Sequence, residues 1–236
     1  EQWNNQNKII QFSAGIEKQF EEGQTLQLFS GLEAPLLAMS LILAREKIKQ
    51  AECMIRMRLA TTRCTNALLE NSGQKPILVI TKGFSDLLEI GDQRRIDLFD
   101  IIPQKRKSFA GPCVEVVERT DRAGQVLTIP DLSGLANQFQ SLKERGHTVA
   151  VVSFLHSYLN DENENTVVHA LQKIGFKTVI GSAKIHPFIK WLPRCEASVL
   201  EGYLNPTLNQ YLHNIKEGLG ENSQLLIMNS AGGLIG

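Results

Sequence analysis

The sequence predicts an α/β fold built on a parallel or mixed sheet. From about residue 53 onward, strand-like and helical segments alternate, which is the order expected of βαβ units. The runs at 76–81 and 148–155 are almost continuously apolar, as strands buried on both faces are. The 236 residues are 42% hydrophobic and 21% charged, so the chain can bury a sizeable core.

The first thirty residues differ from the rest. Short apolar runs at 8–12 and 26–29, separated by glycines, predict two or three strands of a small β element. Pro35 and the apolar stripe after it predict a helix over 34–48, because proline suits the first turn of a helix. We therefore expect a small β element at 1–30, part of an insert, followed by an α/β region at 31–236.

The later elements follow from the period of their apolar residues. Strands are predicted at 54–59, 76–81, 114–118, 125–128, 148–155, 177–181 and 225–228, with 125–128 as the partner of 114–118. Helices are predicted at 65–71, within 83–91, at 131–146, after Asp161 up to Gly175, and at about 196–217 with a step at Pro206. Asp161 and Glu164 have the spacing of a capping box.

Composition excludes several function classes. Lysine plus arginine and aspartate plus glutamate both number 25, so the net charge is zero and gives no reason to expect a nucleic-acid or membrane-surface partner. The four cysteines form no C-x-x-C pair and match no zinc spacing, so we expect reduced thiols in a cytoplasmic protein and no metal site. No apolar run is long enough to span a bilayer, and the polar start is unlike a signal peptide.

The segment from Thr61 to Glu70 carries the strongest local signal. It joins a strand directly to a helix and gathers the short donors Thr61, Thr62, Thr65 and Asn66 at the junction, where an anion such as phosphate would fit. The alternative is an ordinary helix start with Thr62 or Thr65 as the N-cap. Cys64 would be reactive if the helix start lowered its pKa, although burial is the default expectation.

Three further places in the sequence hold candidate site residues. Ser230, Gly232 and Gly233 form a turn after a strand, which either lines a ligand cleft or is simply the exit from a buried strand. His156 ends the most apolar strand, where open α/β sheets place ligands, so it is a candidate substrate-side donor or acid/base; a histidine satisfied by backbone is the alternative. Arg194 is either an anion contact or one partner of an ion pair at a helix start.

Several segments together resemble the hydantoinase A and 5-oxoprolinase family. The resemblance runs in order through TTRCTNALLE at 61–70, TKGFSDLLEIG at 81–91, RIDLFD at 95–100, LHSYLN at 155–160, PR at 193–194, YLNP at 203–206 and MNSAGGL at 228–234. In the 95–100 segment Ile96 replaces the family's proline. Each segment is weak alone, but the set from about residue 30 to 236 is specific.

The resemblance implies an actin-like ATPase fold, shared with acetate and sugar kinases. It also implies use of ATP and Mg²⁺ to phosphorylate the carbonyl oxygen of a small cyclic amide such as 5-oxoproline or hydantoin, followed by ring-opening hydrolysis. A hydantoinase B-like partner subunit or domain is implied as well. On this basis Thr61, Thr62, Thr65, Asn66, Ser230, Gly232 and Gly233 would line a nucleotide or substrate cleft, with His156 and Arg194 on the substrate side; no catalytic residue is assigned.

The chain also departs from the family pattern. The first phosphate loop, an acidic residue followed by G-G-T-F/N-T-D, and the second aspartate-G-G-T segment are both absent from the sequence. We therefore expect an internal fragment, cut before its second phosphate loop, that does not turn over ATP by itself. The alternatives are a ketone carboxylase subunit of the acetone type and a non-catalytic module of the same fold.

Overall fold

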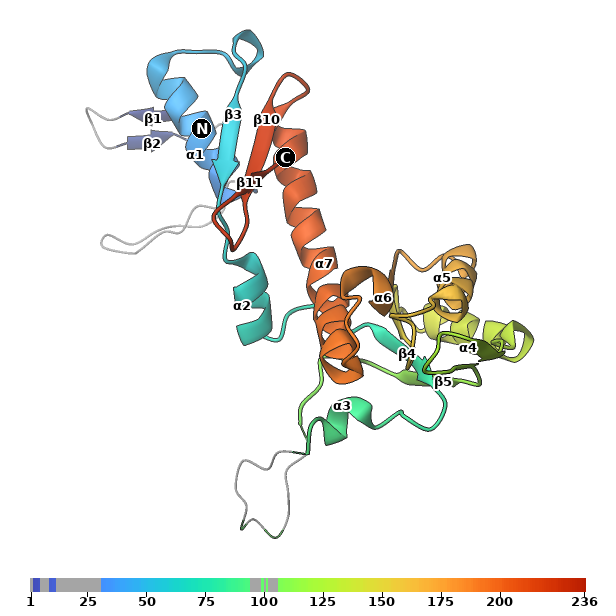
Figure 1. Ribbon diagram of the computed structural model, residues 1–236. Helices are drawn as coiled ribbons and strands as arrows, with labels where there is room; N and C mark the ends of the chain where they lie inside the picture. Colours follow the sequence, from blue (N-terminus) through green and yellow to red (C-terminus); the bar gives the residue numbers. More distant parts are fainter. Residues whose placement is uncertain (1, 5–8, 12–30, 94–98, 100, 102–105) are drawn as a thin grey trace.

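A computed structural model describes residues 2–4, 9–11, 31–93, 99, 101 and 106–236 (Figure 1). At its centre is a parallel sheet in the order β5-β4-β8-β9. The strands are β4 (Ile77–Thr81), β5 (Cys113–Val116), β8 (Val149–Ser153) and β9 (Thr178–Gly181). Every residue of β4 and β8 is buried, which explains their continuous apolar sequences.

Helices cover both faces of this sheet. Alternate residues of β4, such as Ile77 and Val79, join one core with Phe139 of α4 (Leu132–Glu144) and with α5 (Glu162–Ile174). The intervening residues, such as Leu78 and Ile80, join a second core with the short helix α3 (Leu87–Ile90) and the first half of α7 (Trp191–Leu219), while the short helix α6 (Ser182–Ile185) lies against β8, β9 and α7. The period of two along the strands therefore divides the apolar side chains between two cores.

A second, smaller sheet has the order β11-β10-β3. Strand β3 (Arg56–Leu59) is parallel to β10 (Gln224–Met228), and β11 (Leu234–Ile235) pairs antiparallel with β10. Helix α1 (Ala34–Glu46) and the second half of α7 pack against it through Leu36, Leu59, Tyr211, Ile215 and Leu219. The 29-residue α7 thus contributes to the cores of both sheets (Figure 1).

The remaining elements are short. They are α2 (Arg63–Leu69), the 3-10 turn η1 (Gln50–Glu52), and two antiparallel pairs, β1 (Gln2–Asn4) with β2 (Ile9–Gln11) and β6 (Arg119–Thr120) with β7 (Val126–Thr128). The predicted run at 26–29 and most of the 95–100 segment lie outside the described residues. The α/β class and the parallel sheet are confirmed.

Three details of the prediction were wrong. The strand at 126–128 pairs with β6 and not with β5, which pairs with β4 instead. Helix α7 begins at Trp191 and continues past Pro206 without a break. The capping box does not form, because Asp161 makes no side-chain cap bond and the buried Glu164 carboxylate accepts hydrogen bonds from Ala183 and Ser182.

Candidate functional site

The two predicted cleft segments meet at one edge of the smaller sheet. Strands β3 and β10 run parallel, with Leu59 opposite Ile227, so their carboxyl ends lie at the same edge. Thr61 and Thr62 follow β3 and lead into α2, while the turn 229–233 follows β10. We call the set Thr61, Thr62, Thr65, Asn66, Ser230, Gly232 and Gly233 the β3/β10 edge.

The first turn of α2 leaves its short polar side chains available. Thr62 occupies the N-cap position but makes no side-chain cap bond, and Thr61 Oγ1 accepts a 3.2 Å hydrogen bond from the backbone N–H of Arg63. Thr62, Thr65 and Asn66 are exposed. Within the described part of the chain, these three side chains form no hydrogen bond, so the N-cap alternative is wrong for the hydroxyl of Thr62.

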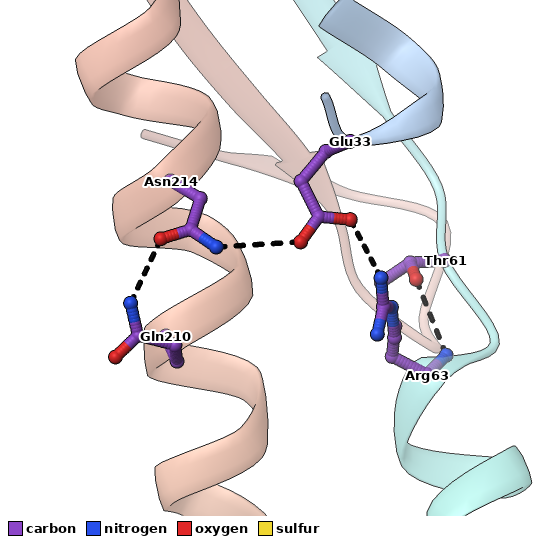
Figure 2. A network of polar contacts seen from close by, with 5 residues as sticks. All are labelled: Glu33, Thr61, Arg63, Gln210 and Asn214. Atoms are coloured by element: carbon purple, nitrogen blue, oxygen red, sulfur yellow. Dashed lines mark hydrogen bonds and ion pairs between the residues drawn. The ribbon is translucent and has the colours of Figure 1, made fainter. Parts of the chain in front are cut away.

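Arg63 ties this turn to two other helices (Figure 2). Its Nη2 lies 2.6 Å from Oε2 of Glu33, the N-cap residue of α1, and its guanidinium carbon lies 4.6 Å from the ring centre of Tyr211 in α7. Asn214 of α7 donates to the other Glu33 oxygen at 3.4 Å. Arg63 had not been predicted as a site residue, and only the ion pair and ring contact reveal its place.

The turn after β10 is held by Asn229. Its Oδ1 accepts hydrogen bonds from the backbone N–H groups of Ala231, at 3.1 Å, and Gly233, at 2.9 Å. Gly232 has a backbone φ of 82°, which residues other than glycine rarely adopt, so this turn favours glycine at that position. Asn229 was missed by the sequence reasoning, although an asparagine before a Ser-x-Gly-Gly turn is a recognisable signal.

The β3/β10 edge is an open surface in this chain. Two hollows of about 240 and 320 Å³ were found, and neither is lined by a residue of this edge. The first lies between α3, the 106–109 segment and α7, and the second lies beside η1 and the end of α7. In the described part of the chain Thr61 is half-buried and the other six residues of this edge are exposed, and their place in a cleft stays a prediction.

His156 and Arg194 lie together at the carboxyl end of β8, at the central sheet. His156 is half-buried, and its buried Nδ1 has no hydrogen-bond partner among the described residues. Its ring centre is 6.2 Å from that of Tyr158, over which the Arg194 guanidinium lies at 5.6 Å. The alternative that backbone groups satisfy both nitrogens of His156 is wrong for Nδ1.

Arg194 is 1% exposed and is committed to the protein itself. It donates to Ser182 Oγ at 3.1 Å and to the carbonyl oxygens of Phe154 at 2.5 Å, Leu155 at 3.0 Å and Phe188 at 2.7 Å. Burial lowers its pKa from the ordinary value. The arginine therefore joins the end of β8 to the segment after α6, and it forms no ion pair at a helix start with any residue that the structure describes.

Two buried carboxylates at the same sheet edge were also missed. Glu164 accepts hydrogen bonds from the Ala183 N–H at 2.8 Å and from Ser182 Oγ at 2.9 Å, and burial raises its pKa. Glu118 accepts from Thr81 Oγ1 at 2.5 Å and from Asn163 Nδ2 at 2.9 Å. Each carboxylate satisfies donors at the ends of strands, which is a sufficient reason for its burial.

No described feature supports an activated thiol or a metal centre made of side chains. The pKa of Cys64 is raised by burial and by the nearby Glu201, so the helix start does not activate this thiol. No group of three or more His, Cys, Asp or Glu side chains among the described residues could hold a metal ion. Within the same residues, no helix is both long and apolar enough to cross a membrane.

Comparison with known proteins gives one family. The family model described as "Hydantoinase/oxoprolinase N-terminal region" matches residues 14–175. The 5-oxoprolinase of Saccharomyces cerevisiae is 32% identical over 208 residues, which cover 76% of this chain and 16% of that protein. The chain thus spans about a sixth of that relative's length.

Two solved structures share the fold. The ATP-dependent caprolactamase of Pseudomonas jessenii matches with a TM-score of 0.68 and 20% identity, over 92% of this chain and 34% of that one. A nucleotide-free acetone carboxylase matches with a TM-score of 0.67 and 24% identity, over 82% and 30% of the two chains. The described α/β architecture is consistent with the actin-like ATPase fold. With a family model matching most of its length, the chain belongs to the hydantoinase/oxoprolinase family.

Proposed function

We propose that this chain is part of an ATP-dependent amidohydrolase that activates the carbonyl of a cyclic amide, 5-oxoproline or a hydantoin, for ring-opening hydrolysis. The observation that carries the proposal is the meeting of two segments at one sheet edge. The Thr61–Asn66 and Ser230–Gly233 segments are far apart in sequence, yet parallel pairing of β3 with β10 brings them together. Family membership supports the reaction class.

The β3/β10 edge offers the donors that such a reaction needs. An amide carbonyl is a poor electrophile, and phosphorylation of its oxygen supplies a good leaving group. Exposed hydroxyl groups of Thr62 and Thr65 and the amide of Asn66 can donate to phosphate or carbonyl oxygens. The Gly232–Gly233 backbone allows close approach of a ligand, because neither residue has a side chain there.

The donor set fits the phosphate groups of ATP, and Mg²⁺ would be held mainly by phosphate oxygens. Magnesium commonly binds through one or two carboxylates plus substrate phosphates, so the lack of a three-ligand cluster among the described residues is compatible with it. The chain's own task would be to bind and orient. Thr62, Thr65 and Asn66 would position the phosphate or the amide from one side of a cleft completed by other parts of the protein.

The test uses the full-length parent protein. We expect phosphate release from ATP that depends on 5-oxoproline or hydantoin, and a fall of about 100-fold in kcat/KM for Thr62→Ala, as for loss of one positioned donor. Thr166→Ala is the matched control, because Thr166 is a helical threonine whose hydroxyl only bonds to the Glu162 carbonyl oxygen. Parental activity in Thr62→Ala would refute the assigned role of this edge.

The isolated chain should not turn over ATP, since its sequence holds neither phosphate loop of the family pattern. Steady phosphate release from the chain alone, lost in Thr62→Ala, would contradict this. A cytoplasmic location and a hydantoinase B-like partner subunit or domain complete the proposal. Copurification of the parent protein with a second subunit, or a matching domain in its own sequence, would support the partner.

Two other functions each have an observation in their favour. The likeness to acetone carboxylase supports a ketone carboxylase subunit, which would consume ATP with ketone plus bicarbonate and not with cyclic amides. The solvent exposure of Thr62, Thr65 and Asn66 is equally compatible with a non-catalytic module. A parent protein that binds no ATP and lacks both aspartate-G-G-T loops would favour the module.

A further inference from the structure

We infer that Arg63 is a positioning residue, which fixes the first turn of α2 against α1 and α7 and does not itself bind the ligand. The inference rests on the proposed function, because what Arg63 positions is the β3/β10 edge. An arginine among clustered threonines would ordinarily suggest a phosphate contact. The described contacts of this side chain give it a different task.

The guanidinium group of Arg63 contacts Glu33 at the start of α1 (Figure 2), and it also contacts Tyr211 of α7. Its Nη2 lies 2.6 Å from Oε2 of Glu33, and its guanidinium carbon lies over the Tyr211 ring, 4.6 Å from the ring centre. Asn214 donates to the second Glu33 oxygen at 3.4 Å and accepts from Gln210 at 2.8 Å. These contacts hold the Glu33 carboxylate in place, and the carboxylate in turn holds the guanidinium group of Arg63.

The burial of the pair is unequal. The Glu33 side chain is 19% exposed and the Arg63 side chain 47%. An exposed ion pair alone contributes little, but a planar cation that pairs with a carboxylate and stacks on an aromatic ring is held in orientation as well as in place. Lysine could supply the charge but not the planar stacking.

The Arg63 clamp adds a fixed point at the first turn of a short helix that also packs along α7. The helix has only seven residues, and Ala67 is its one buried residue. A helix this short is unstable unless tertiary contacts hold it. The Arg63 N–H also donates to Thr61 Oγ1, so the same residue joins the clamp to the first threonine.

Glu33→Gln separates positioning from ligand contact. If Arg63 bound a phosphate, removing the opposing charge would free it and leave or improve the apparent affinity for ATP. If Arg63 positions the turn, Glu33→Gln and Arg63→Ala should both raise the KM for ATP by about tenfold in the full-length parent, with Arg63→Lys between them and the parent. Arg45→Ala is the matched control, since Arg45 pairs only with the adjacent Glu46 at 3.5 Å on the exposed side of α1.

A second readout does not require activity. Hydrogen exchange in the full-length protein should be faster at the α2 amides in Glu33→Gln and Arg63→Ala, and unchanged at the β4 amides. The inference is overturned if α2 exchange stays at the parental rate, or if Arg63→Ala raises the KM and Glu33→Gln does not. A parent without ATP-dependent activity would refute the proposed function while the exchange result still decides the role of Arg63.

Discussion

Replacement of Arg194 by leucine tests whether this residue stabilises the end of the central sheet or serves as a contact for an anionic substrate. The change removes hydrogen bonds to the carbonyl oxygens of Phe154, Leu155 and Phe188 and to Ser182 Oγ, all from a side chain that is 1% exposed. Leucine restores part of the volume but no donor. Three main-chain acceptors are then left without this partner in a dry environment.

The expected cost is large. An unsatisfied buried polar group costs about 1–3 kcal/mol, and the change leaves three carbonyl oxygens without this donor, whose costs do not add fully. We therefore expect Arg194→Leu to lower the free energy of unfolding by about 3–5 kcal/mol. For a chain of 236 residues that corresponds to a fall in Tm of roughly 6–20 °C.

Urea denaturation of the parent chain and the variant, followed by circular dichroism, gives the two free energies and shows whether the m value stays constant. Arg106→Leu is the matched control, because Arg106 lies at the surface with an ion pair to Glu196 at 2.9 Å and should cost less than about 1 kcal/mol. A cost for Arg194→Leu as small as that of the control would refute the structural role and return Arg194 to the candidate anion contacts.

Three further predictions concern a glycine, a cysteine thiol and a buried carboxyl group. Gly73→Ala should cost about 1–3 kcal/mol of stability, because a Cβ there would meet Tyr203 Cε1, and the cost should shrink in a Tyr203→Leu background; equal costs in both backgrounds would contradict the clash. Cys113 is exposed but has a pKa of about 11, raised by burial of its sulfur and by Glu115, so it should react with iodoacetamide at pH 8 more slowly than Cys53; equal rates would refute this. Burial raises the pKa of Glu164 above its ordinary 4.5, so between the two pKa values the folded state keeps a proton that the unfolded state loses. The parent should therefore lose stability relative to Glu164→Gln as the pH rises from 4.5 through the folded pKa. A stability difference between the two proteins that stays constant from pH 5 to 8 would contradict this direction.

Most of the secondary structure was predictable from local patterns. The pattern of apolar residues, with glycines near the ends of the segments, predicted the strands at 77–81 and 149–153 and the helices at 132–144 and 162–174. The predicted capping box was wrong because the Glu164 carboxylate instead accepts a hydrogen bond from a donor just after β9. That donor comes near Glu164 only when the chain is folded. The predicted pairing partner of strand 126–128 was wrong because alternation of apolar and polar residues within one strand does not show which strand it pairs with.

The residues of the candidate site follow from local sequence patterns and stay a prediction, whereas their surroundings could not be derived from the sequence. Clustered threonines and a Gly-Gly turn marked the two segments, and parallel pairing of β3 with β10 supplied the proximity that no local pattern contains. Arg63 was overlooked because its partners, Glu33 and Tyr211, come from distant helices. The openness of the edge also depends on which other segments pack there.

Helix α7 passes from the core of the central sheet to that of the smaller sheet, and its backbone hydrogen bonding is interrupted at Pro206 on the way. Gly202 packs closely on the central sheet, where an added Cβ would lie 2.8 Å from Val151 Cγ2, while Tyr211 belongs to the core of the smaller sheet. Pro206 lies between them and has no N–H for the Gly202 carbonyl oxygen, so one rung of the helix is missing there. Helix α2 spans this point, because Arg63 contacts Tyr211 beyond the proline and Cys64 lies near Glu201 before it, so the threonine turn rests on both parts of α7.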